Sequence, residues 1–475
     1  MRTIKKRAIG KLELVALIVS SCIGAGIFGI TTDISTAAAP GPAILAWLFV
    51  GLGILFLVLS LNNLSQKRPD LESGVFSYAH EALGPLAEFI AGWTYWLSDW
   101  LGNIAIATMM MSALGTFFPI FGNGQTIAAI LFAIVVGWIL TYLVNEGVEN
   151  AAFINTIGTF FKICPLILFL IFVIISFKAG LFTANFWGNA FDNLNGSFKV
   201  GNLWSQIRAS LLTMIWVFIG IEGASVMAHR AKTRKEAEFA SIVAFILLFL
   251  VYVLISILPY GVMTQAQLAK AGQPALGAIL TKLIGWPGTI IINIGLIVST
   301  FISWLSWTLL PAESTMLLAR DKVLPPFWGK TNKKGAPKDS LILTASLQSI
   351  FLFSLLFTKQ AYEFAYSLCV AASLFTYLFV CIYQMKLSRK ENNWGQLLIG
   401  LLGALFQLCC MILAGWKQVL LVTVSFIPGF YLYYKARKYY QKTISLSEKL
   451  VMIFLLLLSI LAIYLVIAGT IKISG

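Results

Sequence analysis

Residues 20–30 read SSCIGAGIFGI, an apolar stretch that contains three glycines, Gly24, Gly26 and Gly29. Each glycine in a helix interior costs about 1 kcal/mol relative to alanine, so a compensating interaction is expected. Residues 218–225, FIGIEGAS, have the same character. The two stretches predict that two helices are interrupted where their glycines lie.

The composition indicates whether these helices lie in water or in a membrane. The chain has 475 residues, of which 59% are hydrophobic and 11% are charged, and its mean hydropathy is +0.87. About a quarter of the residues of a soluble domain are charged. We therefore predict an all-α polytopic membrane protein. Its apolar runs are continuous, which excludes a transmembrane β-barrel.

About 13 transmembrane helices are expected, because a span needs roughly 20 apolar residues. These runs begin near residues 12, 41, 86, 126, 152, 209, 237, 286, 340, 361, 396, 417 and 449. The first run is too long for a cleavable signal peptide.

The net charge of +15 is interpreted as a report of topology. Most of the 34 lysines and arginines lie before span 1 and in alternate loops thereafter. The positive-inside rule then places the N-terminus in the cytoplasm, and an odd number of spans places the C-terminus outside. A nucleic-acid partner is not needed to explain the charge.

Residues for covalent catalysis or metal binding are not evident. There are two histidines, and the six cysteines lie in apolar stretches without metal-ligand spacing, which favours a packing role. No Walker loop, nucleophile elbow or metal signature appears. We expect no enzyme activity, no cofactor and no metal. The cysteines are Cys22, Cys164, Cys369, Cys381, Cys409 and Cys410.

The two glycine-rich spans are five spans apart, which is typical of a transporter binding site. An interrupted helix frees N–H and C=O groups in the membrane, and a substrate carboxylate and ammonium can satisfy them. Glycine also allows a ligand to approach the backbone closely. The alternative is that these glycines only allow close helix packing.

Four segments carry a resemblance to a known family: IGAGIF at 23–28, GNIA at 102–105, WVFIGIEGASV at 216–226 and SWTLLPAESTMLLARDKVLPPFW at 306–328. The chain resembles the amino acid, polyamine and organocation superfamily, and within it the basic amino acid/polyamine antiporters, especially the arginine/ornithine antiporters. This resemblance implies a LeuT-like 5+5 inverted-repeat fold with broken helices 1 and 6. Residues 1–180 would form the first repeat, 181–386 the second and 387–475 the peripheral spans.

The resemblance also implies where substrate binds. Trp216 would gate the site, backbone carbonyls of Ile219 and Gly220 would bind the substrate ammonium, and Trp307 would stack on a cationic side chain. In span 1, a half-helix start near Gly24 favours a carboxylate. Ala25 and Val217 each replace a serine of the similar exchangers. The predicted binding residues are Cys22, Ile23, Gly24, Ala25, Gly26, Asn103, Ile106, Trp216, Ile219, Gly220 and Trp307.

Tyr95, Asp99 and Asn103 share one helical stripe, at i, i+4 and i+8. An acid within a span is costly and is a functional candidate by default. Asp99 is not part of the family pattern, and an extra carboxylate would favour a cationic substrate. The alternative is that Asp99 is hydrated near the outer interface.

Two further charged residues lie within apolar spans. By resemblance Glu222 responds to pH, and Lys162 occupies the space that sodium takes in related transporters. The alternatives are a structural acid for Glu222 and, for Lys162, a side chain that snorkels to the cytoplasmic interface. Tyr95, Asp99, Glu222 and Lys162 form the predicted gating and charge set.

We therefore expect a plasma-membrane antiporter that exchanges a basic amino acid for a related amino acid or amine, arginine for ornithine first. One alternative is exchange of an amino acid for its decarboxylation product, histidine/histamine or agmatine/putrescine. A different class is a non-transporting nutrient receptor or a channel. The expected partners are small amino acids or amines and the lipid bilayer, and a homodimer is left open.

Overall fold

The computed structural model describes residues 10–71, 74–147, 151–188, 201–223, 233–358 and 360–471, with only the backbone for 151–160 and 234. This part of the chain is helical, with connecting turns and no strand. The helices are α1 (Lys11–Cys22), α2 (Gly26–Ala37), α3 (Pro40–Lys67), α4 (Val75–Leu83), α5 (Pro85–Gly115), α6 (Ile127–Asn145), α7 (Ala151–Ile175), α8 (Ala179–Thr183), α9 (Leu203–Trp216), α11 (Arg234–Ile257), α12 (Gln265–Ala269), α13 (Ala275–Ile284), α14 (Trp286–Arg320), α15 (Lys338–Ser354), α16 (Ala361–Lys390), α17 (Trp394–Cys409), α18 (Trp416–Thr423), α19 (Phe426–Tyr439) and α20 (Leu446–Ile467).

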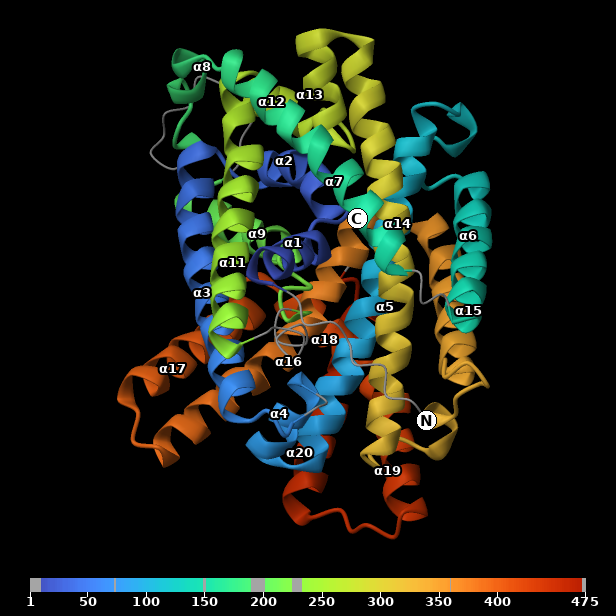
Figure 1. Ribbon diagram of the computed structural model, residues 1–475. Coiled ribbons are helices and arrows are strands. Elements are labelled where there is room, and N and C mark those ends of the chain that lie inside the picture. The colour runs from blue at the N-terminus through green and yellow to red at the C-terminus, as the bar shows by residue number, and fades with distance from the viewer. Residues whose placement is uncertain are drawn as a thin grey trace.

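Long apolar helices run between the two ends of the molecule (Figure 1). Among the described residues, eight helices are long and apolar enough to span a membrane, or up to ten if each of two bent pairs is one span. The prediction of a polytopic helical membrane protein is therefore confirmed. The count of thirteen, the inverted repeats and their boundaries stay predictions.

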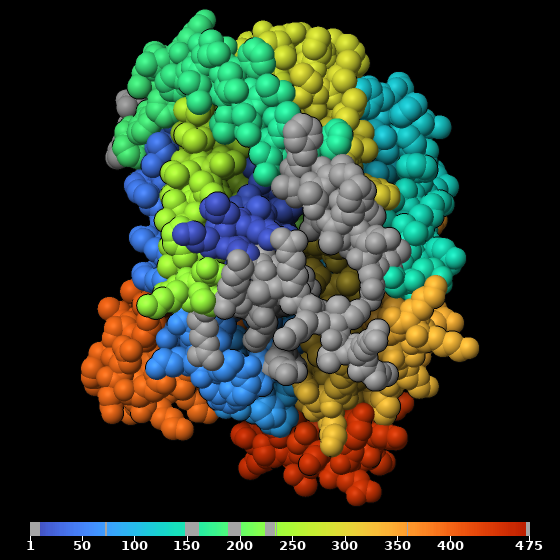
Figure 2. Space-filling view, in the orientation of Figure 1, coloured from blue at the N-terminus to red at the C-terminus, as the bar shows by residue number. Residues whose placement is uncertain are grey.

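The first span is broken, as its glycines predict. α1 ends at Cys22, α2 begins at Gly26, and the two helices meet at an angle of 54°. Figure 2 shows part of α1 at the surface beside α11. α2 continues into the interior, where Thr31 donates a hydrogen bond to the backbone carbonyl of Ile255, on α11, at 3.0 Å. The break thus lies inside the bundle.

A second interruption follows α9. This helix ends at Trp216, and residues 217–222 form turns. Gly220 has a φ of +103°, which only glycine adopts readily. A Cβ on Gly220 would lie 3.2 Å from the backbone oxygen of Ser21, so the two interruptions face each other. The continuation of this span, residues 224–232, lies outside the described residues.

The central helix α5 packs along both α14 and α16. Glycines permit this close contact: a Cβ on Gly92 would overlap the side chain of Leu318, and one on Gly102 would overlap the ring of Trp307. The stripe of α5 that bears Asn103 therefore faces the interior of the bundle, beside α14.

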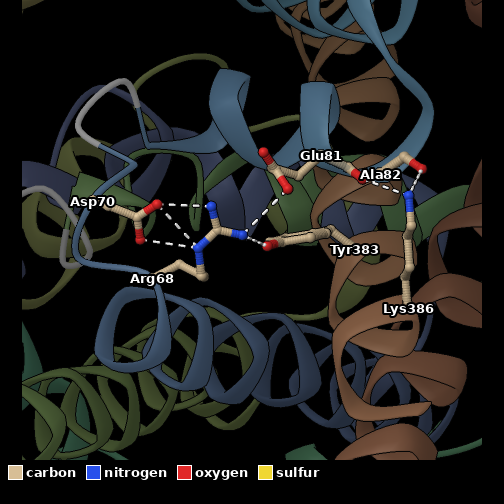
Figure 3. Close-up of polar contacts among 6 residues, drawn as sticks. All are labelled: Arg68, Asp70, Glu81, Ala82, Tyr383 and Lys386. Atoms are coloured by element: carbon tan, nitrogen blue, oxygen red, sulfur yellow. Dashed lines mark hydrogen bonds and ion pairs between the residues drawn. The ribbon is translucent and has the colours of Figure 1, made fainter. Parts of the chain in front are cut away.

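An ionic cluster joins the α3–α4 connection to α16, at the end of the molecule where α4 lies (Figures 1 and 3). The Arg68 guanidinium donates to Asp70 at 2.7 Å, to Glu81 at 3.2 Å and to the Tyr383 hydroxyl. Lys386 donates to the backbone oxygen of Glu81 at 2.8 Å. We call these residues the Arg68 cluster.

Candidate functional site

Aromatic rings surround the break in the first span. A Cβ on Gly26 would lie 2.8 Å from the indole ring of Trp216, so this glycine lets α2 pack directly against that ring. Trp216 stacks on Tyr366 at 6.0 Å between centroids and meets Trp307 edge-on at 6.0 Å. Its indole N–H donates to the Tyr362 hydroxyl at 3.2 Å. The break is therefore covered by aromatic side chains from three other segments.

Asn103 holds Trp307 in place. Its amide nitrogen donates to the backbone oxygen of Trp307 at 2.8 Å, and the Asn103 side chain is 1% exposed. The amide oxygen of Asn103 is buried and has no hydrogen-bond partner. Ile106, on the next turn of α5, is also buried. The hydrogen bond of Asn103 thus ties α5 to α14 at the position of Trp307.

Asp99 lies one turn before Asn103 on α5 and is 2% exposed. Its Oδ2 atom is buried and has no hydrogen-bond partner. This burial contradicts the alternative of a hydrated acid at the membrane interface. A buried acid without a partner is costly, which makes Asp99 a strong candidate for direct contact with a ligand.

Glu222 is anchored by its surroundings. Its Oε2 atom accepts hydrogen bonds from the backbone N–H of Gly220 at 3.1 Å and from the Tyr377 hydroxyl at 2.7 Å. Tyr95 and Asp99 lie close enough to interact electrostatically with its carboxyl group. Glu222 thus has the bonds of a structural acid and also joins the break after α9 to α5 and α16.

Lys162 is buried, with 2% of its surface exposed. Its ammonium donates to the backbone oxygen of Ser20 at 3.1 Å and to the Ser303 hydroxyl at 3.0 Å. The alternative of snorkelling to the interface is therefore wrong. A cation near the C-terminal end of α1 also interacts favourably with the helix dipole. Lys162 thus connects α7 to α1 and α14, next to the break between α1 and α2.

The remaining predicted residues fall in the same region. Cys22 ends α1, Ile23 to Ala25 form the break, and Ile219 lies in the turns after α9. Reasoning from the sequence missed three tyrosines of α16 that contact the predicted residues, Tyr362, Tyr366 and Tyr377. The signal that could have found them is a set of tyrosines at near-helical spacing within one apolar span. No group of three or more potential metal ligands occurs within the described ranges.

Comparison with known proteins gives relatives over the full length. The sequence pattern of the family described as "Amino acid permease" matches residues 9–474. An arginine/ornithine antiporter of Latilactobacillus sakei is 48% identical over 473 residues, which cover 98% of each chain. The arginine/ornithine antiporter ArcD1 of Lactococcus lactis subsp. cremoris is 43% identical, over 97% of this chain and 90% of the relative. An arginine/agmatine antiporter of Chlamydia pneumoniae is 34% identical over 99% of each chain.

Proposed function

The chain belongs to the amino acid permease family, and from this membership we propose that it is a membrane antiporter that exchanges arginine for ornithine. The membership confirms the superfamily resemblance of its sequence motifs. Relatives with the name arginine/ornithine antiporter reach 48% identity over nearly the whole chain. That similarity favours arginine/ornithine exchange over a receptor or a channel.

The observation that carries the proposal is the meeting of two interrupted spans beside Trp307. α2 starts at Gly26, and no side chain caps its free N–H groups, which suit a substrate carboxylate. The turns of residues 217–222 would offer backbone carbonyls to the substrate ammonium, including that of Gly220, which also accepts a hydrogen bond from the Gly223 N–H at 3.0 Å. The indole face of Trp307 suits the cationic end of the side chain.

The charged residues support a gated site of this kind. Trp216 packs on Gly26 and must move aside before a ligand reaches the break. Glu222 and Tyr95, from two different spans, would pass a change of protonation to the site. Lys162 would supply a fixed positive charge where α1 meets α14, so that exchange does not depend on sodium.

We further propose a multi-pass plasma-membrane location with a cytoplasmic N-terminus and an extracellular C-terminus. The two repeats at residues 1–180 and 181–386 would carry the site, with 387–475 peripheral. Its partners would be amino acids or amines and the lipid bilayer.

Counterflow in proteoliposomes tests the exchange. Vesicles loaded with ornithine should accumulate labelled external arginine, and empty vesicles should not. Equal uptake by loaded and empty vesicles, or current without internal substrate, would overturn the antiporter proposal. The 34% identity to an arginine/agmatine antiporter supports a second candidate exchange. Vesicles loaded with agmatine distinguish the two exchanges. An arginine/ornithine antiporter should take up less arginine into these vesicles than into vesicles loaded with ornithine.

Replacing Trp307 by leucine should weaken arginine binding about five-fold. The change keeps an apolar side chain but removes the indole face, and a cation over such a face contributes about 1 kcal/mol. Inhibition of counterflow by unlabelled arginine measures the effect. Trp304→Leu is the matched control, since Trp304 lies on the same helix and contacts none of the aromatic rings around the break. Equal losses of affinity in both variants would contradict the role of Trp307.

A further inference from the structure

Asn103 has an unpartnered acceptor oxygen inside the bundle. Its amide nitrogen is engaged by the backbone oxygen of Trp307 at 2.8 Å, whereas its Oδ1 atom is buried without a partner. Because the Trp307 carbonyl can only accept, the amide is held in this orientation. The Oδ1 atom of Asn103 is therefore an acceptor available to a ligand, while one N–H of the amide is bound to Trp307.

Asp99 extends this character along α5. It lies four residues before Asn103, so the two side chains occupy neighbouring positions on one face of the helix. Its Oδ2 atom is also buried without a partner, and its side chain is 2% exposed. Among the described residues, no ion pair includes Asp99. Two unpartnered oxygens, Oδ2 of Asp99 and Oδ1 of Asn103, thus lie on residues one turn apart.

Within the part of the chain that the structure describes, no cation is among the groups that interact with Asp99. The titratable groups that interact with it are Glu222, from the segment after α9, Cys369, from α16, and Tyr95, one turn away on α5. None of these is a cation. Trp307 is adjacent, because Asn103 binds its backbone and Gly102 packs on its ring. Buried acceptors of this kind are rare in folded proteins and call for a partner.

We infer that the unpartnered oxygens of Asp99 and Asn103 form a pair of acceptors that receives the end of the substrate side chain. This inference rests on the proposed function and deepens it. The pair accepts end groups that only donate hydrogen bonds and carry positive charge, namely the ammonium of ornithine and the guanidinium of arginine. It disfavours a neutral ureido or carboxamide end, because such a group carries no positive charge to attract the carboxylate of Asp99 and has an acceptor oxygen in place of one donor.

Substitution of Asp99 by asparagine tests this inference with citrulline as probe. Citrulline has nearly the shape of arginine but carries a neutral ureido group. Wild-type counterflow of labelled arginine should be inhibited by ornithine at least ten-fold more strongly than by citrulline. Asp99→Asn should lose at least ten-fold in ornithine affinity and should gain in citrulline affinity, since an asparagine amide can turn its NH₂ toward the ureido oxygen.

Glu88→Gln is the matched control. Glu88 is a second buried acid on α5, 2% exposed, and its carboxylate is bound to His80 at 2.6 Å, far along the helix from Asp99. Its substitution should leave the ratio of ornithine to citrulline affinity unchanged.

The outcomes separate the inference from the function. An unchanged ratio in Asp99→Asn, or equal loss for both ligands, would make Asp99 a structural acid and overturn the inference. A wild-type protein that binds citrulline as well as ornithine would overturn it without any variant, even if Asp99→Asn does not fold. Absence of arginine/ornithine counterflow in the wild type would instead remove the proposed function.

Discussion

Replacing Gly26 by leucine should abolish arginine/ornithine counterflow while the protein still inserts in the membrane. Even a single carbon at this position would lie 2.8 Å from the ring of Trp216 and 2.9 Å from the side chain of Val217. A leucine side chain adds three further carbons and fills the space beside the free N–H groups at the start of α2. The leucine side chain then excludes both the packing of Trp216 against α2 and a ligand bound at the break.

The measurement is counterflow per amount of purified, monodisperse protein. Gly180→Leu is the matched control, because a Cβ at Gly180 meets no atom within 4 Å. It should retain the wild-type rate. Wild-type exchange by Gly26→Leu would show that ligand does not bind at the break in the first span.

Replacing Lys162 by methionine should lower the exchange rate at least 100-fold. Methionine keeps an unbranched apolar stem but leaves the backbone oxygen of Ser20 and the hydroxyl of Ser303 without the ammonium that binds them. Each hydrogen bond to a charged group contributes about 1.5–3 kcal/mol, and about 1.4 kcal/mol corresponds to a factor of ten. Without these two hydrogen bonds, we expect α1 to move away from α14.

Lys178→Met is the control, since Lys178 is exposed and directly precedes α8, outside the long helices. It should exchange at the wild-type rate. The wild type should also exchange equally fast in sodium and choline buffers. A fully active Lys162→Met variant, or a wild type that requires sodium, would contradict the role assigned to Lys162.

The features that the sequence predicted well are those that depend on neighbouring residues. Composition alone indicated membrane helices, and the glycines between Cys22 and Phe28 indicated the break between α1 and α2, which the 54° angle confirms. The count of thirteen spans stays a prediction, because α9 ends at Trp216 and residues 224–232 of that span lie outside the described residues.

The features that escaped prediction depend on contacts between distant residues. Lys162 binds Ser20, 142 residues away, and Glu222 binds Tyr377, 155 residues away. Periodicity carries no information about such pairs. For the same reason the sequence left open whether Asp99 and Lys162 reach water, which the packing of α5 and α7 decides. The unpartnered oxygens of Asp99 and Asn103 also become visible only when every neighbour is in place.

The Arg68 cluster joins α4 to α16, and we expect the strength of this connection to depend on ionic strength. Asp70 and Glu81 are both more than a third exposed, so water competes for the guanidinium and dissolved ions screen its attraction to the carboxylates. Any motion that parts α4 from α16 must break the hydrogen bonds of Lys386 to α4 and must separate Arg68 from either Glu81 on α4 or Tyr383 on α16. We expect these ionic contacts to weaken at high ionic strength and to strengthen at low ionic strength.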